Sequence, residues 1–275
     1  MLWWLAVYLP AFLALWLYLI APGRAGREKR APFLNRAYAH RGLYEADQSV
    51  PENSLPAFSR AAEAGYGVEL DVQLSRDGRI VVFHDDDLRR ACGLDARVEE
   101  LDFEALRALR LFGGGERIPL FSEALETIGG RVPLIVELKA GRRQKLLCER
   151  TREALLRYDG ACCVESFHPA IVRWFYRNAP ELLRGQLSEA FRFSRRSIGV
   201  PAAFAMSRLL LNCLTRPDFI AYRIGPKCLS VRLAERLGAM RVAWTARDAA
   251  GHARIAAAND AVIFEAYRPP AGPPH

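Results

Sequence analysis

Short apolar runs of strand type alternate with stretches of helical period over most of the chain. The runs are rich in Val, Ile, Leu and Phe, as expected for strands buried on both faces of a parallel sheet. They lie at residues 37–40, 67–74, 134–138, 163–167, 184–187, 219–222, 242–244 and 261–264. Eight strands with helices between them, within residues 36–268, predict an α/β fold, a (β/α)8 TIM barrel rather than an open doubly wound sheet.

A ninth apolar run, residues 80–83, follows the turn signal Arg76-Asp77-Gly78. We expect this run to fold back on the second strand as a short hairpin insertion, outside the eight-strand count. Helices are predicted at residues 55–64, where Ser54 is the cap, and at 101–109, 121–128 and 170–177.

The first residues of the chain predict a membrane anchor. No charged residue occurs between Leu2 and Ile20, and about 18 to 20 apolar residues just cross a bilayer core of about 30 Å. A cleaved signal peptide is the alternative, but it requires a basic start and a small-residue cleavage site. We therefore expect a transmembrane helix at residues 1–22 and a basic juxtamembrane linker at 23–35.

The basic residues that follow the anchor predict its orientation. They are Arg24, Arg27, Lys29, Arg30 and Arg36. The positive-inside rule places such a cluster on the cytoplasmic side, close to anionic lipids. The expected location is the cell membrane, single-pass, with the catalytic domain in the cytoplasm.

Composition adds two exclusions. The six cysteines show no C-x-x-C spacing, which argues against a zinc site and against a disulfide framework. The net charge of +8 is compatible with nucleic-acid binding, but no basic-aromatic stacking pattern accompanies it, so no nucleic-acid partner is expected. The Pro-rich residues 269–275 predict a flexible tail.

Three carboxylates suggest a metal site. Glu69 and Asp71 are two residues apart on one predicted strand, and Glu137 lies near the end of another. Alternation along a strand turns residues i and i+2 to the same side, and catalytic groups of TIM barrels lie at the carboxyl ends of strands. Converging carboxylates repel one another unless a cation joins them, which favours one hard divalent ion, Mg²⁺ or Ca²⁺. The alternative is that they pair with Arg or Lys as rim charges.

Two of the five histidines accompany these acids at predicted strand ends. His40 and His84 stand in His-Arg-Gly and Val-Phe-His-Asp contexts, and imidazoles that titrate near neutrality suit acid/base catalysis. Arg41 and Lys139 are candidates for holding phosphate oxygens. Asp85 either orients a histidine or caps the following turn. These residue types together favour hydrolysis of a phosphodiester.

At these residues the chain resembles the glycerophosphodiester phosphodiesterase family, in a membrane-anchored bacterial-type branch. The matching segments include Ala39-His40-Arg41-Gly42, Pro51-Glu52-Asn53-Ser54, Glu69-Leu70-Asp71-Val72, Val81-Val82-Phe83-His84-Asp85, Val136-Glu137-Leu138-Lys139, Glu165-Ser166-Phe167 and Ala243-Trp244-Thr245. The resemblance implies a metal held by Glu69, Asp71 and Glu137, and acid/base roles for His40 and His84. It also implies substrate contacts from Arg41, Lys139 and Trp244, whereas Glu52 and Asn53 are expected to shape the loop after the first strand.

The chain departs from the family pattern in three places. Arg247 stands where Asn is frequent, and Glu265 stands where Asp is frequent. Glu265 either replaces that Asp or is a rim charge. Residues 191–216 are longer and more apolar than an average connection, and predict either an interfacial helix that meets lipid-derived substrates or an ordinary barrel helix.

The function expected from the resemblance is metal-dependent hydrolysis of glycerophosphodiesters to an alcohol and sn-glycerol 3-phosphate, with acid/base catalysis by histidine. One alternative is a lysophospholipase D that acts on lysophospholipids. A second is a non-catalytic membrane-bound module that binds glycerophosphodiesters or a protein partner.

Overall fold

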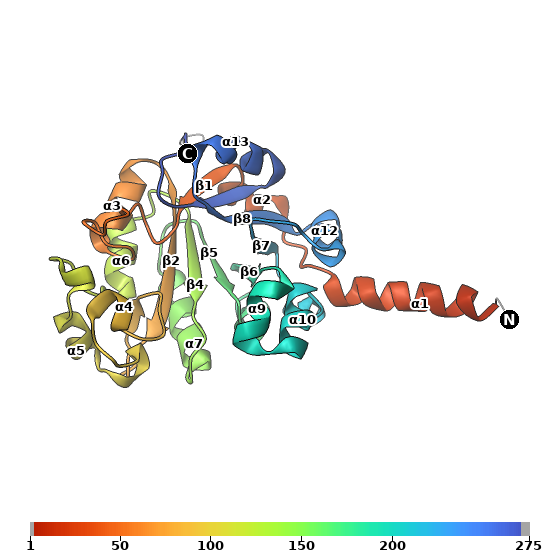
Figure 1. Cartoon of the computed structure of the whole chain (residues 1–275), viewed down its shortest axis with the longest axis horizontal. Coiled ribbons are helices and arrows are strands. Elements are labelled where there is room, and N and C mark those ends of the chain that lie inside the picture. Colours follow the sequence, from red (N-terminus) through yellow and green to blue (C-terminus); the bar gives the residue numbers. More distant parts are fainter. Residues whose placement is uncertain (1–2, 271–275) are drawn as a thin grey trace.

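Eight parallel strands close into a barrel in the computed structural model, which describes residues 3–270 (Figure 1). The strands follow one another around the barrel in chain order, and pairing of the last strand with β1 and of β1 with β2 completes the ring. They are β1 Arg36–Ala39, β2 Gly67–Leu74, β4 Leu134–Leu138, β5 Cys162–Ser166, β6 Leu183–Ser188, β7 Phe219–Arg223, β8 Met240–Ala246 and β9 Ala261–Phe264. All eight predicted strands are confirmed, and with them the barrel.

The predicted hairpin is also confirmed. β3 Ile80–Val82 pairs antiparallel with the end of β2, Val72 opposite Val82. The segment that follows it is larger than expected, because its side chains build a separate small core around Leu88, Leu106 and Ile118. Its helices are α4 Arg89–Cys92, η2 Val98–Glu100, α5 Phe103–Ala108 and η3 Leu111–Gly113.

Helices cover the outside of the barrel. They are α3 Leu55–Glu63, α6 Phe121–Ile128, α7 Gln144–Leu155, α8 Pro169–Asn178, α12 Leu229–Arg236 and α13 Ala249–Ala258. The Ser54 hydroxyl accepts a hydrogen bond from the Ala57 amide at 3.4 Å, which confirms the predicted cap. Three short helices, α9 Phe191–Ile198, α10 Val200–Ser207 and α11 Asn212–Thr215, lie between β6 and β7.

Alternation along the strands divides the side chains between two environments. On β2, Val68, Leu70 and Val72 belong to the core under the outer helices, so Glu69 and Asp71 face the barrel interior. At the amino ends of the strands, the barrel interior is filled by large rings such as that of Phe219. This ring occupies the space that a side chain at Gly185 would need, since a Cβ at that position would lie 2.0 Å from it. Apolar packing at the amino ends of the strands therefore leaves the polar residues to the carboxyl ends.

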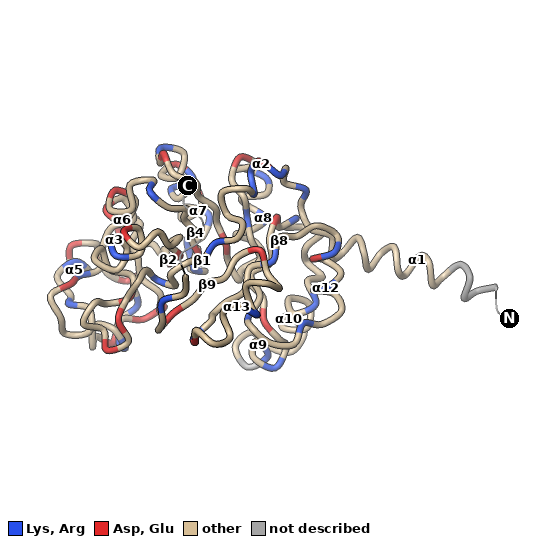
Figure 2. The backbone as a smooth tube through the Cα atoms, turned by 90° about the horizontal axis from the view of Figure 1, so that it is seen from above, with Lys and Arg blue, Asp and Glu red and all other residues tan. Residues whose placement is uncertain are grey.

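The N-terminal helix α1 Trp3–Ile20 extends away from the barrel (Figure 1), and it carries no charged residue, whereas acidic and basic residues are spread over the body (Figure 2). Its C-terminal end is attached to the body: Ile20 is buried, and the Asn212 side chain donates a hydrogen bond to the Ile20 carbonyl at 3.0 Å.

No helix within residues 3–270 combines the length and the apolarity that crossing a membrane requires. The predicted transmembrane anchor at residues 1–22 and the predicted single-pass location in the cell membrane, with a cytoplasmic catalytic domain, are therefore wrong. Residues 1 and 2 of that prediction lie outside the described residues, as do residues 271–275 of the predicted tail.

Two basic residues of the predicted linker contact the barrel. They lie on and around α2 Arg27–Arg30, which is followed by η1 Ala31–Phe33. Lys29 donates to the Pro180 carbonyl at 2.8 Å and Arg30 to the Gly238 carbonyl at 2.7 Å, while Phe33 is buried. Part of the positive charge in this segment thus fixes the chain to the barrel.

Candidate active site

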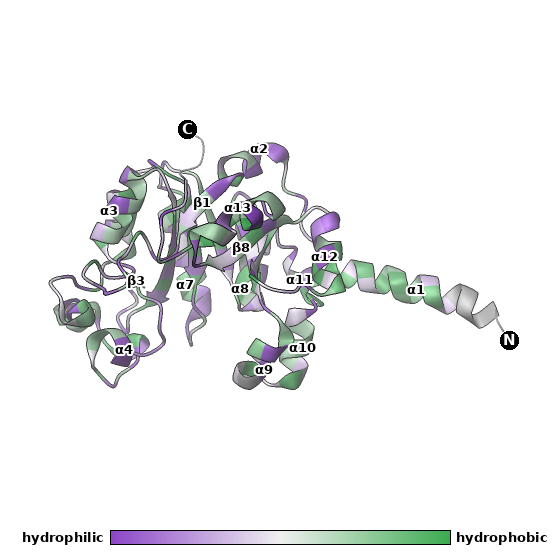
Figure 3. Cartoon of the chain, turned by 45° about the horizontal axis from the view of Figure 1, so that its top comes forward, coloured by the Kyte–Doolittle hydropathy of each residue, from purple (hydrophilic) through white to green (hydrophobic). Residues whose placement is uncertain are grey.

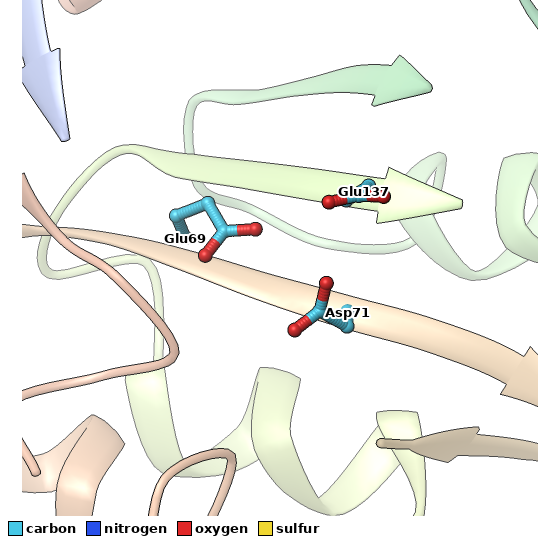
Figure 4. Close-up of side chains that lie close together, drawn as sticks. All are labelled: Glu69, Asp71 and Glu137. Atoms are coloured by element: carbon cyan, nitrogen blue, oxygen red, sulfur yellow. The ribbon is translucent and has the colours of Figure 1, made fainter. Parts of the chain in front are cut away.

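The three predicted metal ligands converge at the carboxyl end of the barrel. Figure 4 shows Glu69 and Asp71 projecting from β2 and Glu137 from β4 into one region. Each offers a carboxylate oxygen within 4.8 Å of the others. The register places Asp71 opposite Glu137, and the inward phase of both strands turns the acids to the same side. The sequence prediction that these residues share one side is confirmed.

Burial makes this cluster electrostatically costly. Glu69 and Asp71 are 2% and 0% exposed, and Glu137 is also buried. Burial, reinforced by the charges of Asp71 and Glu137, raises the pKa of Glu69 well above its ordinary value. Burial acts in the same direction on Asp71, but the charges of Lys139 and Arg41, together with the neighbouring His84, hold its pKa well below the ordinary value.

Lys139 provides part of the compensating charge. Its ammonium nitrogen lies 2.8 Å from Oδ1 of Asp71 and 2.7 Å from Oε1 of Glu137. These contacts raise the pKa of Lys139 although burial opposes the shift. Glu69 accepts a hydrogen bond from the Arg41 backbone amide, at 3.0 Å. Three buried carboxylates with one ammonium between two of them form an oxygen-rich, negatively charged set of donors, which fits a hard divalent cation.

A sharp turn after β1 aims that amide at Glu69. Arg41 has a φ of 56°, in the left-handed region that residues other than glycine seldom adopt. Gly42 follows with a φ of 80°, and a Cβ at this position would lie 2.8 Å from Ala57. The His-Arg-Gly sequence thus fits a turn that only glycine can complete at its second position.

His40 is held by a carboxylate from the other end of the chain. Its Nδ1 lies 2.5 Å from Oε2 of Glu265, and Arg247 donates to the other Glu265 oxygen at 2.6 Å. Because a carboxylate accepts at Nδ1, that nitrogen carries the hydrogen, and Nε2 faces the acids, 4.0 Å from Oε2 of Glu69. Burial lowers the pKa of His40, and the bond to Glu265 opposes this lowering. Glu265 therefore orients the histidine and is more than a rim charge.

His84 is held in the same way. Its Nδ1 lies 2.6 Å from Oδ1 of Asp85, and Arg90 donates to the other Asp85 oxygen at 2.6 Å. This contact favours the orienting interpretation of Asp85 over the cap. Arg90 also donates to Glu52 at 2.6 Å, and Glu52 accepts a further bond from Arg41 at 2.6 Å. A continuous chain of ion pairs therefore links the loop that carries His84 to the turn that carries Arg41.

One pocket of about 430 Å³ brings the site together. It is lined by His40, Arg41, Glu69, His84, Glu137, Lys139 and Trp244. These are all the predicted site residues except Asp71, which lies fully buried beneath them. Trp244 packs edge-on against Phe167, with ring centroids 5.6 Å apart, and its indole nitrogen donates to the Ala221 carbonyl at 3.0 Å.

Sequence reasoning missed several residues of this site. Glu165 on β5 lines the pocket, is 2% exposed, and leaves one carboxylate oxygen without a hydrogen-bond partner. The available signal was its place near the end of a predicted strand, residues 163–167; the structure places it opposite Glu137. Asn53, expected only to shape a loop, donates to Oδ2 of Asp71 at 2.8 Å. Arg223 also lines the pocket, over the Phe193 ring.

Comparison with known proteins supports the resemblance noted from the motifs. A relative from Caldanaerobacter subterraneus subsp. tengcongensis, a glycerophosphodiester phosphodiesterase, is 35% identical over 163 residues, which are 54% of this chain and 65% of the relative. Another of the same name, from Bacillus altitudinis, is 30% identical over 54% of this chain and 64% of its own length. The match thus spans slightly less than two thirds of each of these relatives.

Solved structures show the same fold. An Oleispira antarctica phosphodiesterase, solved with the product sn-glycerol-3-phosphate, superimposes with a TM-score of 0.67 over 84% of this chain and 93% of its own, at 24% identity. The model of the glycerophosphoryl diester phosphodiesterase family matches residues 40–266, which include every residue of the candidate site. The chain therefore belongs to the glycerophosphoryl diester phosphodiesterase family.

Proposed function

We propose that this protein hydrolyses glycerophosphodiesters to an alcohol and sn-glycerol 3-phosphate. The observation that carries the proposal is the convergence of Glu69, Asp71 and Glu137 in a pocket that both His40 and His84 line. Family membership and the names of the two relatives support the same reaction, as does the complex of the Oleispira phosphodiesterase with its product sn-glycerol-3-phosphate.

Glu69, Asp71 and Glu137 would hold one divalent cation, Mg²⁺ or Ca²⁺. When bound, this ion supplies charge neutralisation for the phosphate. Lys139 and Arg41 hold phosphate oxygens from the rim of the pocket; their ion pairs with the acids position both cations before substrate arrives. Trp244 forms an apolar wall for the glycerol carbons.

The two histidines move protons at opposite ends of the reacting phosphate. The nucleophile is the glycerol hydroxyl next to the phosphate-bearing carbon, since its proximity replaces a bimolecular encounter. His40 removes its proton through Nε2, the new O–P bond closes a cyclic phosphate, and His84 protonates the departing alcohol. Water then opens the ring, with the proton transfers reversed, and yields sn-glycerol 3-phosphate. Glu265 and Asp85 fix the ring orientations that these transfers need.

Two substitutions test the assignment. Glu69→Gln removes an anionic ligand and His84→Ala removes an acid/base group, and both variants are assayed on glycerophosphocholine with an excess of Mg²⁺ or Ca²⁺. We expect a loss of at least 100-fold in kcat for His84→Ala, about the size of one acid/base contribution, and a loss of ion-dependent activity for Glu69→Gln. Unchanged turnover in either variant refutes the assignment, and activity that persists in a chelator refutes the metal dependence.

A further inference from the structure

A second pocket lies at the opposite end of the barrel from the candidate active site. It has a volume of about 620 Å³. Arg184 near the start of β6 and Asp218 just before β7 line it, so it lies at the amino ends of the strands. Residues 21–26, which join α1 to α2, line another side. In Figure 3 these residues lead from the mostly apolar α1 to the hydrophilic α2.

The charged side chains of this pocket are mainly basic, and we call it the basic pocket. Its cations are Arg24, Lys29, Arg184 and Arg216, and its only acid is Asp218. Three cations are therefore in excess. Cations that converge on one cavity create a positive potential there, which attracts an anion.

Arg184 is a fixed hydrogen-bond donor in this pocket. Its side chain is 9% exposed, and its Nη2 lies 3.0 Å from Oδ2 of Asp218. Its Nε donates to the Arg216 carbonyl at 3.2 Å, and its guanidinium carbon lies 5.3 Å from the centre of the Tyr176 ring. In the part of the chain that the structure describes, Nη1 of this buried guanidinium has no hydrogen-bond partner. An unpaired buried donor costs free energy, which a bound acceptor would recover.

Backbone carbonyls hold two of the other cations. Arg216 donates to the Ala21 carbonyl at 3.0 Å, and Lys29 donates to the Pro180 carbonyl at 2.8 Å. A carbonyl orients a cation but does not neutralise its charge. Positioned donors that keep their charge are what a phosphate group requires, because each of its oxygens accepts several hydrogen bonds.

We propose that the basic pocket binds the dianionic phosphate group of a small phosphate monoester. Its volume lies within the range of about 300–1,000 Å³ that is typical of small-molecule sites, so it has room for more than the phosphate. The exposed rings of Tyr18 and Tyr176 offer apolar walls for the ester carbons. The basic pocket shares no lining residue with the candidate active site, so its ligand does not depend on the proposed function.

A matched pair of variants tests the location. Arg24→Glu reverses a charge on an exposed side chain of the pocket, and Arg27→Glu makes the same change three residues further on, outside its lining. Inorganic phosphate is titrated calorimetrically into the full chain and both variants, with a chelator present and at constant ionic strength. We expect Arg24→Glu to weaken binding by about tenfold or more, the size of one charge-assisted contact. Arg27→Glu should weaken it by less than about twofold, because salt screens exposed charges.

Two outcomes of this titration overturn the proposal. One is that the wild type does not bind phosphate. The other is that both variants weaken binding equally, which would show a general attraction of the basic segment for anions. Phosphate that binds in the active-site pocket does not imitate the expected difference, since neither substitution lies in that pocket.

Two probes of similar size test the class of ligand. At about pH 8 methyl phosphate is a dianion, whereas dimethyl phosphate carries a single charge. We expect the wild type to bind methyl phosphate at least about tenfold more tightly, and Arg24→Glu to reduce this preference. Arg184→Met, which removes the buried donor, should abolish the preference in a chain that still folds. Equal affinity of the wild type for the two probes overturns the assignment to phosphate monoesters.

Discussion

Replacement of Glu265 by Gln tests the support of His40. Burial raises the pKa of Glu265, but the bonds to His40 and Arg247 outweigh this effect and lower the pKa from 4.5 to about 2. At about 1.4 kcal/mol per pKa unit, the ionised carboxylate contributes roughly 3 kcal/mol to the fold. Solvent reaches part of this pair, since the Arg247 side chain is 68% exposed, so we expect roughly 1–2 kcal/mol in practice.

The pH dependence of this loss has a defined sign. A carboxyl group whose pKa is depressed by folding stabilises the folded state above its unfolded pKa, and this contribution disappears as the pH falls through the folded pKa. The difference between wild type and Glu265→Gln should therefore be full at pH 7 and shrink from about pH 4.5 towards pH 2. It is measured as the free energy of unfolding in urea at several pH values.

A matched variant controls for the loss of surface charge. Glu45→Gln removes an exposed carboxylate that pairs with Arg60 at 3.0 Å, both side chains being more than 40% exposed, and should cost less than about 1 kcal/mol. A Glu265→Gln variant that is no less stable than Glu45→Gln at pH 7, or whose deficit does not change with pH, would refute the reasoning.

Three further predictions concern the buried charges. Without metal, Glu69→Gln should have a higher Tm than the wild type, because it removes one of three carboxylates that repel one another. Mg²⁺ or Ca²⁺ should no longer raise the Tm of this variant in a thermal scan. A Tm below that of the metal-free wild type would contradict the repulsion. Arg90→Met should lower kcat on glycerophosphocholine about tenfold, because Asp85 loses the ion pair that holds it against His84. Arg90→Lys should restore part of this activity. An equal loss of kcat in both variants would show that the charge of Arg90 has no part in the effect. Burial raises the pKa of Glu165 well above its ordinary value, so the Glu165 carboxylate destabilises the fold increasingly as the pH rises above about 4.5. Glu165→Gln should therefore have a larger free energy of unfolding in urea than the wild type at pH 8 but not at pH 4. A difference that does not change with pH would argue against the raised pKa.

The repeating pattern of the sequence was sufficient for the barrel and for most of the site. Alternation along a strand is a local property, so Glu69 and Asp71 had to share one side with each other, and apolar neighbours such as Val68 and Leu70 determined which side was inward. The end of each strand likewise determined that His40 and Lys139 lie at the mouth of the barrel.

Contacts between distant loops were beyond that pattern. Glu265 reaches His40 from 225 residues away, and Arg90 reaches Glu52 across 38 residues. Such pairs depend on how β9 pairs with β1 and on how the segment after β3 packs. The hydrophobic periodicity of the sequence predicts neither arrangement. Glu165 was missed for a related reason, because its closeness to Glu137 follows from the register between neighbouring strands.

The sequence by itself therefore determined the barrel and the inward phase of its acids, because both follow from local alternation and from strand ends. Tertiary structure alone decided which carboxylate holds which histidine, and it decided that residues 191–216 form short helices. It also corrected the prediction of a membrane anchor, since no helix within residues 3–270 meets the requirements for crossing a membrane. Pairing across the barrel and packing of one loop on another are contacts between residues that lie far apart in the sequence. They form only in the folded barrel, and local sequence patterns do not predict them.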